Sequence, residues 1–118
     1  MTRNALVCAF VLILPALSAA QDAKPAPVPR AKAVELYEAN CQVCHGANGA
    51  GTPLTKDLRF VGRKWKHGNR QQDVVKTITE GVTGTPMLPF KGRLSSAEIA
   101  ALASLVRSYD KPLKPGKH

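Results

Sequence analysis

The sequence is short of acidic residues, of aromatic residues and of long hydrophobic runs, and each shortage excludes a class of protein. Only 8 Asp and Glu accompany 17 Lys and Arg, so the formal net charge is +9. One tryptophan and two tyrosines, with basic residues scattered along the chain, make nucleic-acid binding a poor fit. The apolar run over residues 5–17 has 13 residues, whereas a membrane-spanning helix needs about 20. We therefore expect neither nucleic-acid binding nor stable membrane insertion.

Residues 1–20 have the pattern of an export signal. Arg3 gives a short basic start, the apolar run over 5–17 follows, and Ser18 and Ala20 fit the small positions before a signal-peptidase cut. We expect residues 1–20 to be removed and the product to be exported, to the periplasm in a bacterium. An uncleaved membrane anchor is the alternative.

Removal of this signal changes the chemistry that remains. Cys8 is lost, so Cys41 and Cys44 are the two remaining cysteines, and Met87 becomes the only methionine. The basic side chains fall from 17 to 16 against 8 acidic ones, which lowers the net charge from +9 to +8. A basic exported chain is expected to favour acidic protein surfaces, anionic membranes or polyanions.

The rest of the chain divides into a Pro/Ala-rich linker over 21–31, a folded domain over 32–110 and a basic tail over 111–118. The linker alternates proline with small residues and has no core of its own. The folded domain shows no internal repeat and no convincing strand, so we predict an all-α fold.

Three helices are predicted, over residues 32–40, 70–80 and 96–109. Asn69 is the expected cap of the second, and Ser95 with Glu98 forms a capping box for the third. Helical spacing selects the residues that should face the core: Ala33, Val34, Leu36, Tyr37, Val74, Val75, Ile78, Ile99, Leu102, Ala103, Val106 and Tyr109. These helices are short and their loops are long, so something besides side chains should fill the middle.

The stretch CQVCH, residues 41–45, holds two thiols and an imidazole, and four interpretations compete. A structural zinc site needs about four ligands, and no second pair of Cys or His follows. A redox-active dithiol normally follows a strand, whereas this motif follows a helix. A disulfide between Cys41 and Cys44 would close a very short loop and leave His45 unexplained.

The fourth interpretation is covalent haem, which we favour. In C-x-x-C-H the two thiols attach the haem and the adjacent histidine binds its iron. A large apolar macrocycle would also supply the buried surface that the short helices lack. The second iron ligand would then be Met87, in a loop stiffened by Pro86 and Pro89, or His67, or none. His67 lies among basic residues and has the surroundings of an exposed turn.

From Ala33 to Tyr109 the chain resembles the class I c-type cytochromes. The matching stretches are AVELYEANCQVCHG, ITEGVTGTPMLPF and AEIAALASLVRSY. The resemblance implies a small cytochrome c fold, three to five short helices and long loops around one haem. It also implies covalent attachment at Cys41 and Cys44, with His45 and Met87 as the axial iron ligands.

Two further residues take expected roles from this resemblance. Pro53 matches the proline whose carbonyl orients the axial histidine, and Trp65 matches a haem-packing aromatic whose indole N–H would donate to a propionate, a core tryptophan being equally expected. The chain departs from the family pattern at Ala33, where glycine is frequent, and at Leu88, which separates Met87 from Pro89.

The function expected from these residues is outer-sphere electron transfer between redox proteins, with no catalytic side chain and no enzyme activity of its own. We expect a soluble carrier that docks on acidic oxidase, reductase or dehydrogenase surfaces, less tightly as salt rises. The alternatives are a haem-bearing subunit of a dehydrogenase or oxidase complex and a haem sensor with an exchangeable ligand. The docking candidates are Lys64, Lys66, Lys91 and Arg93.

Overall fold

The structure is a computed structural model that describes residue 24 and residues 26–110. Within these residues the elements, in chain order, are α1 (Arg30–Asn40), α2 (Gln42–His45), the 3-10 helices η1 (Ala47–Gly49) and η2 (Lys56–Leu58), α3 (Gln71–Glu80) and α4 (Ser96–Tyr109). The β pairing found in this part of the chain is one isolated bridge between Lys91 and Leu94. The all-α prediction is therefore confirmed. None of the described helices has the length and apolar character needed to cross a bilayer.

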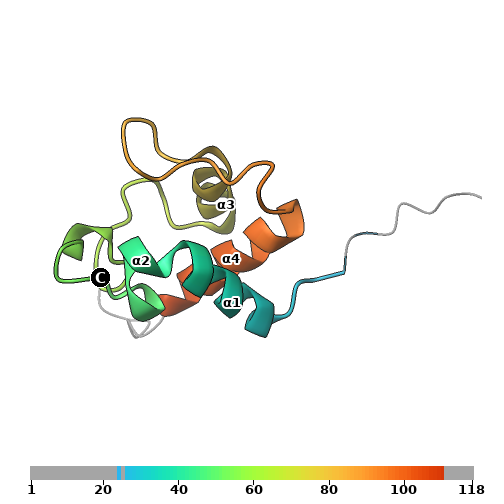
Figure 1. Cartoon of the computed structure of the whole chain (residues 1–118), viewed down its shortest axis with the longest axis horizontal. Coiled ribbons are helices and arrows are strands. Elements are labelled where there is room, and N and C mark those ends of the chain that lie inside the picture. Colours follow the sequence, from blue (N-terminus) through green and yellow to red (C-terminus); the bar gives the residue numbers. More distant parts are fainter. Residues whose placement is uncertain (1–23, 25, 111–118) are drawn as a thin grey trace, which may run out of the picture.

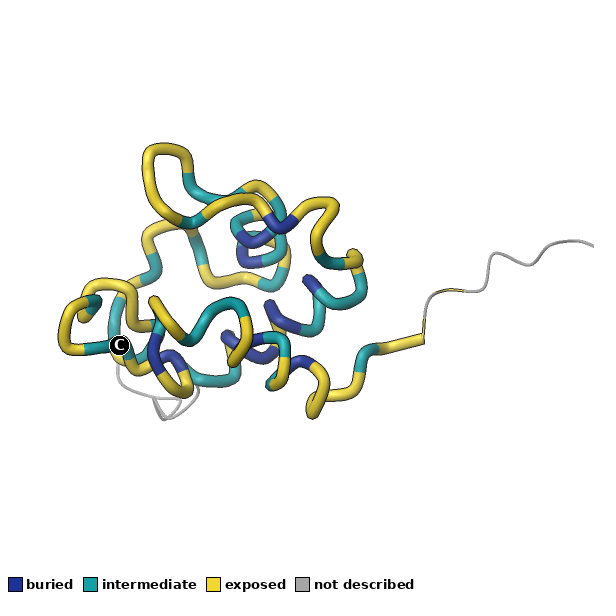
Figure 2. Tube along the Cα trace, viewed as in Figure 1, coloured by how far each residue is buried: buried dark blue, intermediate teal, exposed yellow. Residues whose placement is uncertain are grey.

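Helix α4 is the centre of the packing, because both α1 and α3 lie against it. Figure 1 shows α1 crossing α4, with α3 above them. Buried segments lie mainly on these helices, whereas the connecting loops are mostly exposed (Figure 2). The buried core consists of Ala33, Tyr37, Val74, Ile78, Phe90, Ile99, Leu102, Ala103, Leu105 and Val106.

Helix α1 begins two residues earlier than its sequence pattern predicts. Its N-cap is Pro29, whose ring fixes φ at −59°, and the first helical residue is Arg30. The Arg30 guanidinium donates to the Ser108 hydroxyl at 3.3 Å, which joins the start of α1 to the end of α4. The first helix therefore starts two residues before residue 32, where the domain was expected to begin.

Helix α3 is capped by Arg70, so the prediction of Asn69 as its cap is wrong. The Asp73 carboxylate accepts hydrogen bonds from the Arg70 backbone N–H at 3.2 Å and from its Nε at 2.9 Å. This pair closes the first turn and leaves Asn69 outside it. Gln71 then donates to the Ala100 carbonyl at 2.9 Å, which fastens the start of α3 to α4.

Helix α4 begins as its capping box predicts. The Ser95 hydroxyl accepts from the Glu98 N–H at 3.2 Å, and the Glu98 carboxylate accepts from the Ser95 N–H at 2.8 Å. The predicted inward residues are buried or packed against the core. Leu105 was not predicted, yet it is buried, because α4 has two neighbouring helices and its apolar face is wider than one helical stripe.

The predicted export signal over 1–20 and the basic tail over 111–118 lie outside the described residues, and both stay predictions.

Replacing Ser95 with alanine should lower the free energy of unfolding by about 1 kcal/mol, because the Glu98 N–H loses its side-chain acceptor. The measurement is urea unfolding followed by far-UV circular dichroism. Ser96→Ala is the matched control, since Ser96 is exposed inside the first turn and not at the cap. Equal losses in the two variants would contradict the capping role.

Candidate functional site

The CQVCH motif lies in a single turn where α1 passes into α2. The Cys41 N–H donates to the Tyr37 carbonyl at 2.8 Å, and the His45 N–H donates to the Cys41 carbonyl at 2.9 Å. Cys41 and Cys44 are both free thiols, the first half-buried and the second exposed. Burial raises the pKa of the Cys41 thiol to about 11, so it is protonated at neutral pH. One turn therefore presents two thiols and an imidazole together.

The His45 ring is oriented by a hydrogen bond from Nδ1 to the Leu58 carbonyl, with 2.7 Å between the two atoms. A carbonyl only accepts, so Nδ1 carries the proton and the lone pair of the neutral ring is on Nε2. Burial lowers the pKa of His45, although the bond to the Leu58 carbonyl opposes this shift. The ring is thus suited to bind a metal through Nε2. The acceptor in this structure is the Leu58 carbonyl, whereas Pro53 is exposed, and the expected role of the Pro53 carbonyl stays a prediction.

Two aromatic side chains pack in sequence beside His45: Phe60 contacts the imidazole, and Trp65 contacts Phe60. The Phe60 ring stacks on the imidazole with 4.5 Å between centroids and 18° between planes. The ring centroids of Trp65 and Phe60 are 5.3 Å apart, and the Trp65 indole N–H donates to the Phe60 carbonyl at 2.9 Å. The single N–H of Trp65 is therefore used inside the chain in this structure, and its expected bond to a haem propionate stays a prediction.

The backbone around the motif is fixed from both sides. The buried Tyr37 hydroxyl donates to the Gly46 carbonyl at 2.8 Å, and the Thr55 hydroxyl donates to the Cys44 carbonyl at 2.6 Å. Gly46 has φ +76°, and a Cβ there would overlap the Gly51 carbonyl. A residue with a side chain cannot take this position without moving the loop.

Met87 lies in the loop between α3 and α4, which closes on itself through hydrogen bonds. The Val82 N–H donates to the Met87 carbonyl at 2.9 Å, and the Met87 N–H donates to the Thr85 hydroxyl at 3.2 Å. The Thr85 hydroxyl in turn donates to the Val82 carbonyl at 2.7 Å. Met87 is half-buried and packs against the same core cluster as Cys41 and Trp65.

Exposed apolar side chains gather in the segments that carry the site. The large hydrophobic residues that the described chain leaves exposed are Val43, Leu54, Leu58 and Leu88. They belong to the motif, to the loop after it and to the position next to Met87. The donor groups of this site are two thiols, an imidazole with a free Nε2 and a thioether, and apolar side chains surround them. This combination fits a covalently attached haem.

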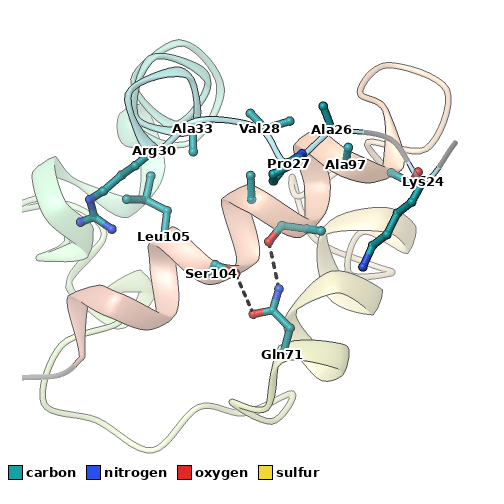
Figure 3. A pocket seen from close by; sticks show the side chains of 13 residues that line it. Lys24, Ala26, Pro27, Val28, Arg30, Ala33, Gln71, Ala97, Ser104 and Leu105 are labelled. Atoms are coloured by element: carbon teal, nitrogen blue, oxygen red, sulfur yellow. Dashed lines mark hydrogen bonds between the residues drawn. The ribbon is translucent and has the colours of Figure 1, made fainter.

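Two further features of the described residues were considered as sites. His67 is exposed, as expected, and no group of three or more His, Cys, Asp and Glu with metal-binding geometry occurs within the described chain. A cavity of about 680 Å³ lies between the segment before α1 and the face of α4, with Gln71 and Ser104 on its wall (Figure 3). The residues that line this cavity do not include Cys41, Cys44, His45 or Met87.

Solved structures of small cytochromes share this fold. The c-type cytochrome KustC0563 is 31% identical with a TM-score of 0.54, and the match covers 67% of this chain and 98% of that one. Cytochrome c6 of the diatom Phaeodactylum tricornutum is 25% identical with a TM-score of 0.55, over 69% of this chain and 93% of that one. The fold and the resemblance thus define a class I c-type cytochrome with covalently bound haem c.

The family can be stated more narrowly. A family model described as cytochrome c oxidase, cbb3-type, subunit III matches residues 29–106, and the chain belongs to this family. The cbb3-type oxidase subunit FixP of Azorhizobium caulinodans is 36% identical over 73% of this chain, and subunit CcoP of Azospirillum brasilense is 33% identical over 65% of it. The matched regions are 29% and 27% of those proteins, so the chain spans under a third of their length.

Gly81→Ala should lower the free energy of unfolding by about 1–3 kcal/mol, because Gly81 has φ +68° and an added Cβ would lie 2.5 Å from the Met87 carbonyl oxygen. Gly84→Ala is the control: Gly84 has φ +77°, but nothing lies within 4 Å of its added Cβ. It therefore carries the backbone strain without the overlap. Thermal unfolding of the two purified variants should show the larger loss of stability for Gly81→Ala. An equal loss of stability in Gly84→Ala would contradict a close approach of Gly81 to the Met87 carbonyl.

Proposed function

We propose that this chain is a haem-bearing electron-transfer subunit, or part of one, that serves an oxidase of the cbb3 type. The observation that carries this proposal is the match of residues 29–106 to the subunit III family. The resemblance to FixP and CcoP supports it. These relatives favour the complex subunit over the soluble carrier that was the first expectation from the sequence.

Four side chains take the roles in haem binding that the resemblance assigns them. Cys41 and Cys44 would form the thioether bonds to the haem, and its iron would be bound by His45 through Nε2 and by Met87 through its sulfur. The haem iron supplies a reversible one-electron change when it is bound. The free Nε2 of His45 and the partly buried thioether of Met87 support this assignment.

The protein's part in electron transfer is to keep these ligands in place. The Leu58 carbonyl holds His45, and the closed turn from Val82 to Met87 holds the thioether loop. Ligands that stay fixed require little rearrangement when the charge of the bound centre changes. The proposed reaction needs no acid, base or nucleophile from the chain, so we propose no catalytic residue and no enzyme activity for it alone.

A free, exported carrier is the second candidate. Its supporting observation is that the matched fold covers 98% of KustC0563 and 93% of the diatom cytochrome. Lys64, Lys66, Lys91 and Arg93 are all exposed and would meet an acidic partner in either case. Export of the domain belongs to both candidates.

The two candidate functions predict different results when the chain is purified, because a subunit should elute with its complex and a carrier should elute alone. We expect the tagged full chain, expressed in its own host, to elute with a large, oxygen-consuming complex from detergent-solubilised membranes. It should remain there after a wash in high salt, which releases a carrier held by surface charge. Haem staining of the fractions identifies the chain. Recovery in the soluble fraction, at the size of a 12.6 kDa monomer or its processed form, would contradict the subunit proposal.

A further inference from the structure

The orientation of the His45 ring needs more than its one hydrogen bond. The Nδ1–H to Leu58 bond, at 2.7 Å, fixes the direction in which one ring atom points. Hydrogen bonds at carbonyl oxygens tolerate a broad range of angles, so this bond leaves the ring free to rock about its own axis. A second contact, against the face of the ring, is needed to define its plane.

Phe60 makes that second contact. Its ring lies nearly parallel to the imidazole, with 18° between the planes and 4.5 Å between the centroids. A flat ring against a flat ring resists tilting in both directions, which a branched aliphatic side chain does not. Both residues are partly buried.

Phe60 is itself held at several points. Its N–H donates to the Gly49 carbonyl at 2.7 Å, and its carbonyl accepts from the Trp65 indole at 2.9 Å. Its ring fits against Gly49, where an added Cβ would lie 2.6 Å from Phe60 Cδ2. Gly49 has φ +71°, a conformation that glycine adopts without strain. The Phe60 ring that packs on His45 is therefore held by its backbone hydrogen bonds and by its contact with Gly49.

We propose that Phe60 is a positioning residue that sets the plane of the His45 imidazole, and that Trp65 supports it through its bond to the Phe60 carbonyl. This inference rests on the proposed binding of haem iron by His45. The plane of an imidazole bound to haem iron determines which iron orbitals it overlaps, so Phe60 would act on the electronic properties of the bound centre through His45.

The test compares Phe60→Leu, which removes the flat ring, with Phe60→Tyr, which keeps it. The readout is the set of electron paramagnetic resonance g values of the oxidised, haem-loaded protein, together with the paramagnetically shifted haem methyl resonances. Both report the orientation of the axial ligand. Ile99→Val is the control for lost packing, because it shortens a buried side chain of α4 and leaves the His45–Phe60 pair intact.

Phe60→Leu should change the g values and the spread of the methyl shifts, whereas Phe60→Tyr and Ile99→Val should keep the wild-type pattern. A wild-type pattern in Phe60→Leu, with reduced stability alone, would overturn the proposal and make Phe60 a space-filling residue. Trp65→Phe is a milder change that removes only the indole donor, and it should shift the pattern in the same direction by less. If Phe60→Leu does not take up haem, an unchanged pattern in Trp65→Phe counts against the proposal.

The haem content distinguishes this inference from the proposed function. The pyridine haemochrome spectrum of the wild-type protein measures covalent haem independently of ligand orientation. Covalent haem with an unchanged pattern in the variants overturns only the role of Phe60. A wild-type protein with no covalent haem overturns the proposed binding by Cys41 and Cys44, and the inference with it.

Discussion

The packing of α1 and α3 against the apolar face of α4 is the constraint on which the rest of the structure depends. Leu102 and Leu105 are almost completely buried there. Helix α1 leads directly into the C-x-x-C-H turn, and α3 leads into the loop that carries Met87. Both halves of the site are thus placed relative to one another through α4, although they are 42 residues apart when counted from His45 to Met87. The buried apolar contacts between these helices thereby determine where the side chains of the C-x-x-C-H turn and of the Met87 loop lie.

Within the loops, order comes from local hydrogen bonds and not from regular structure. The Leu58 carbonyl and the Thr55 hydroxyl hold the motif from the side of the following loop, and Thr85 closes the turn before Met87. Glycines with positive φ, Gly46 and Gly81 among them, let these segments approach each other closely. These loops also leave apolar residues exposed next to the site.

The sequence predicts features that depend on short-range patterns. The capping box at Ser95 and the helical spacing in α4 identify that helix, and the C-x-x-C-H motif identifies the site. The Arg70 cap was missed because the Asp73 bond, and not the usual small polar cap residue, closes the first turn of α3. Phe60 and the Leu58 carbonyl were missed because the short helix η2 and the irregular residues after it bring them to His45, and no periodic pattern signals such a contact.

The most direct test of the account is the absorbance spectrum of the purified protein, oxidised and reduced, with and without carbon monoxide. The account predicts a far-red iron–thioether band in the oxidised wild type that disappears in Met87→Ala, and a carbon monoxide shift in that variant alone. Leu88→Ala is the matched control, because the exposed Leu88 is the neighbour of Met87 in the same loop, and it should keep the band. A carbon monoxide shift in the wild type, or a far-red band that survives in Met87→Ala, would contradict ligation by His45 and Met87.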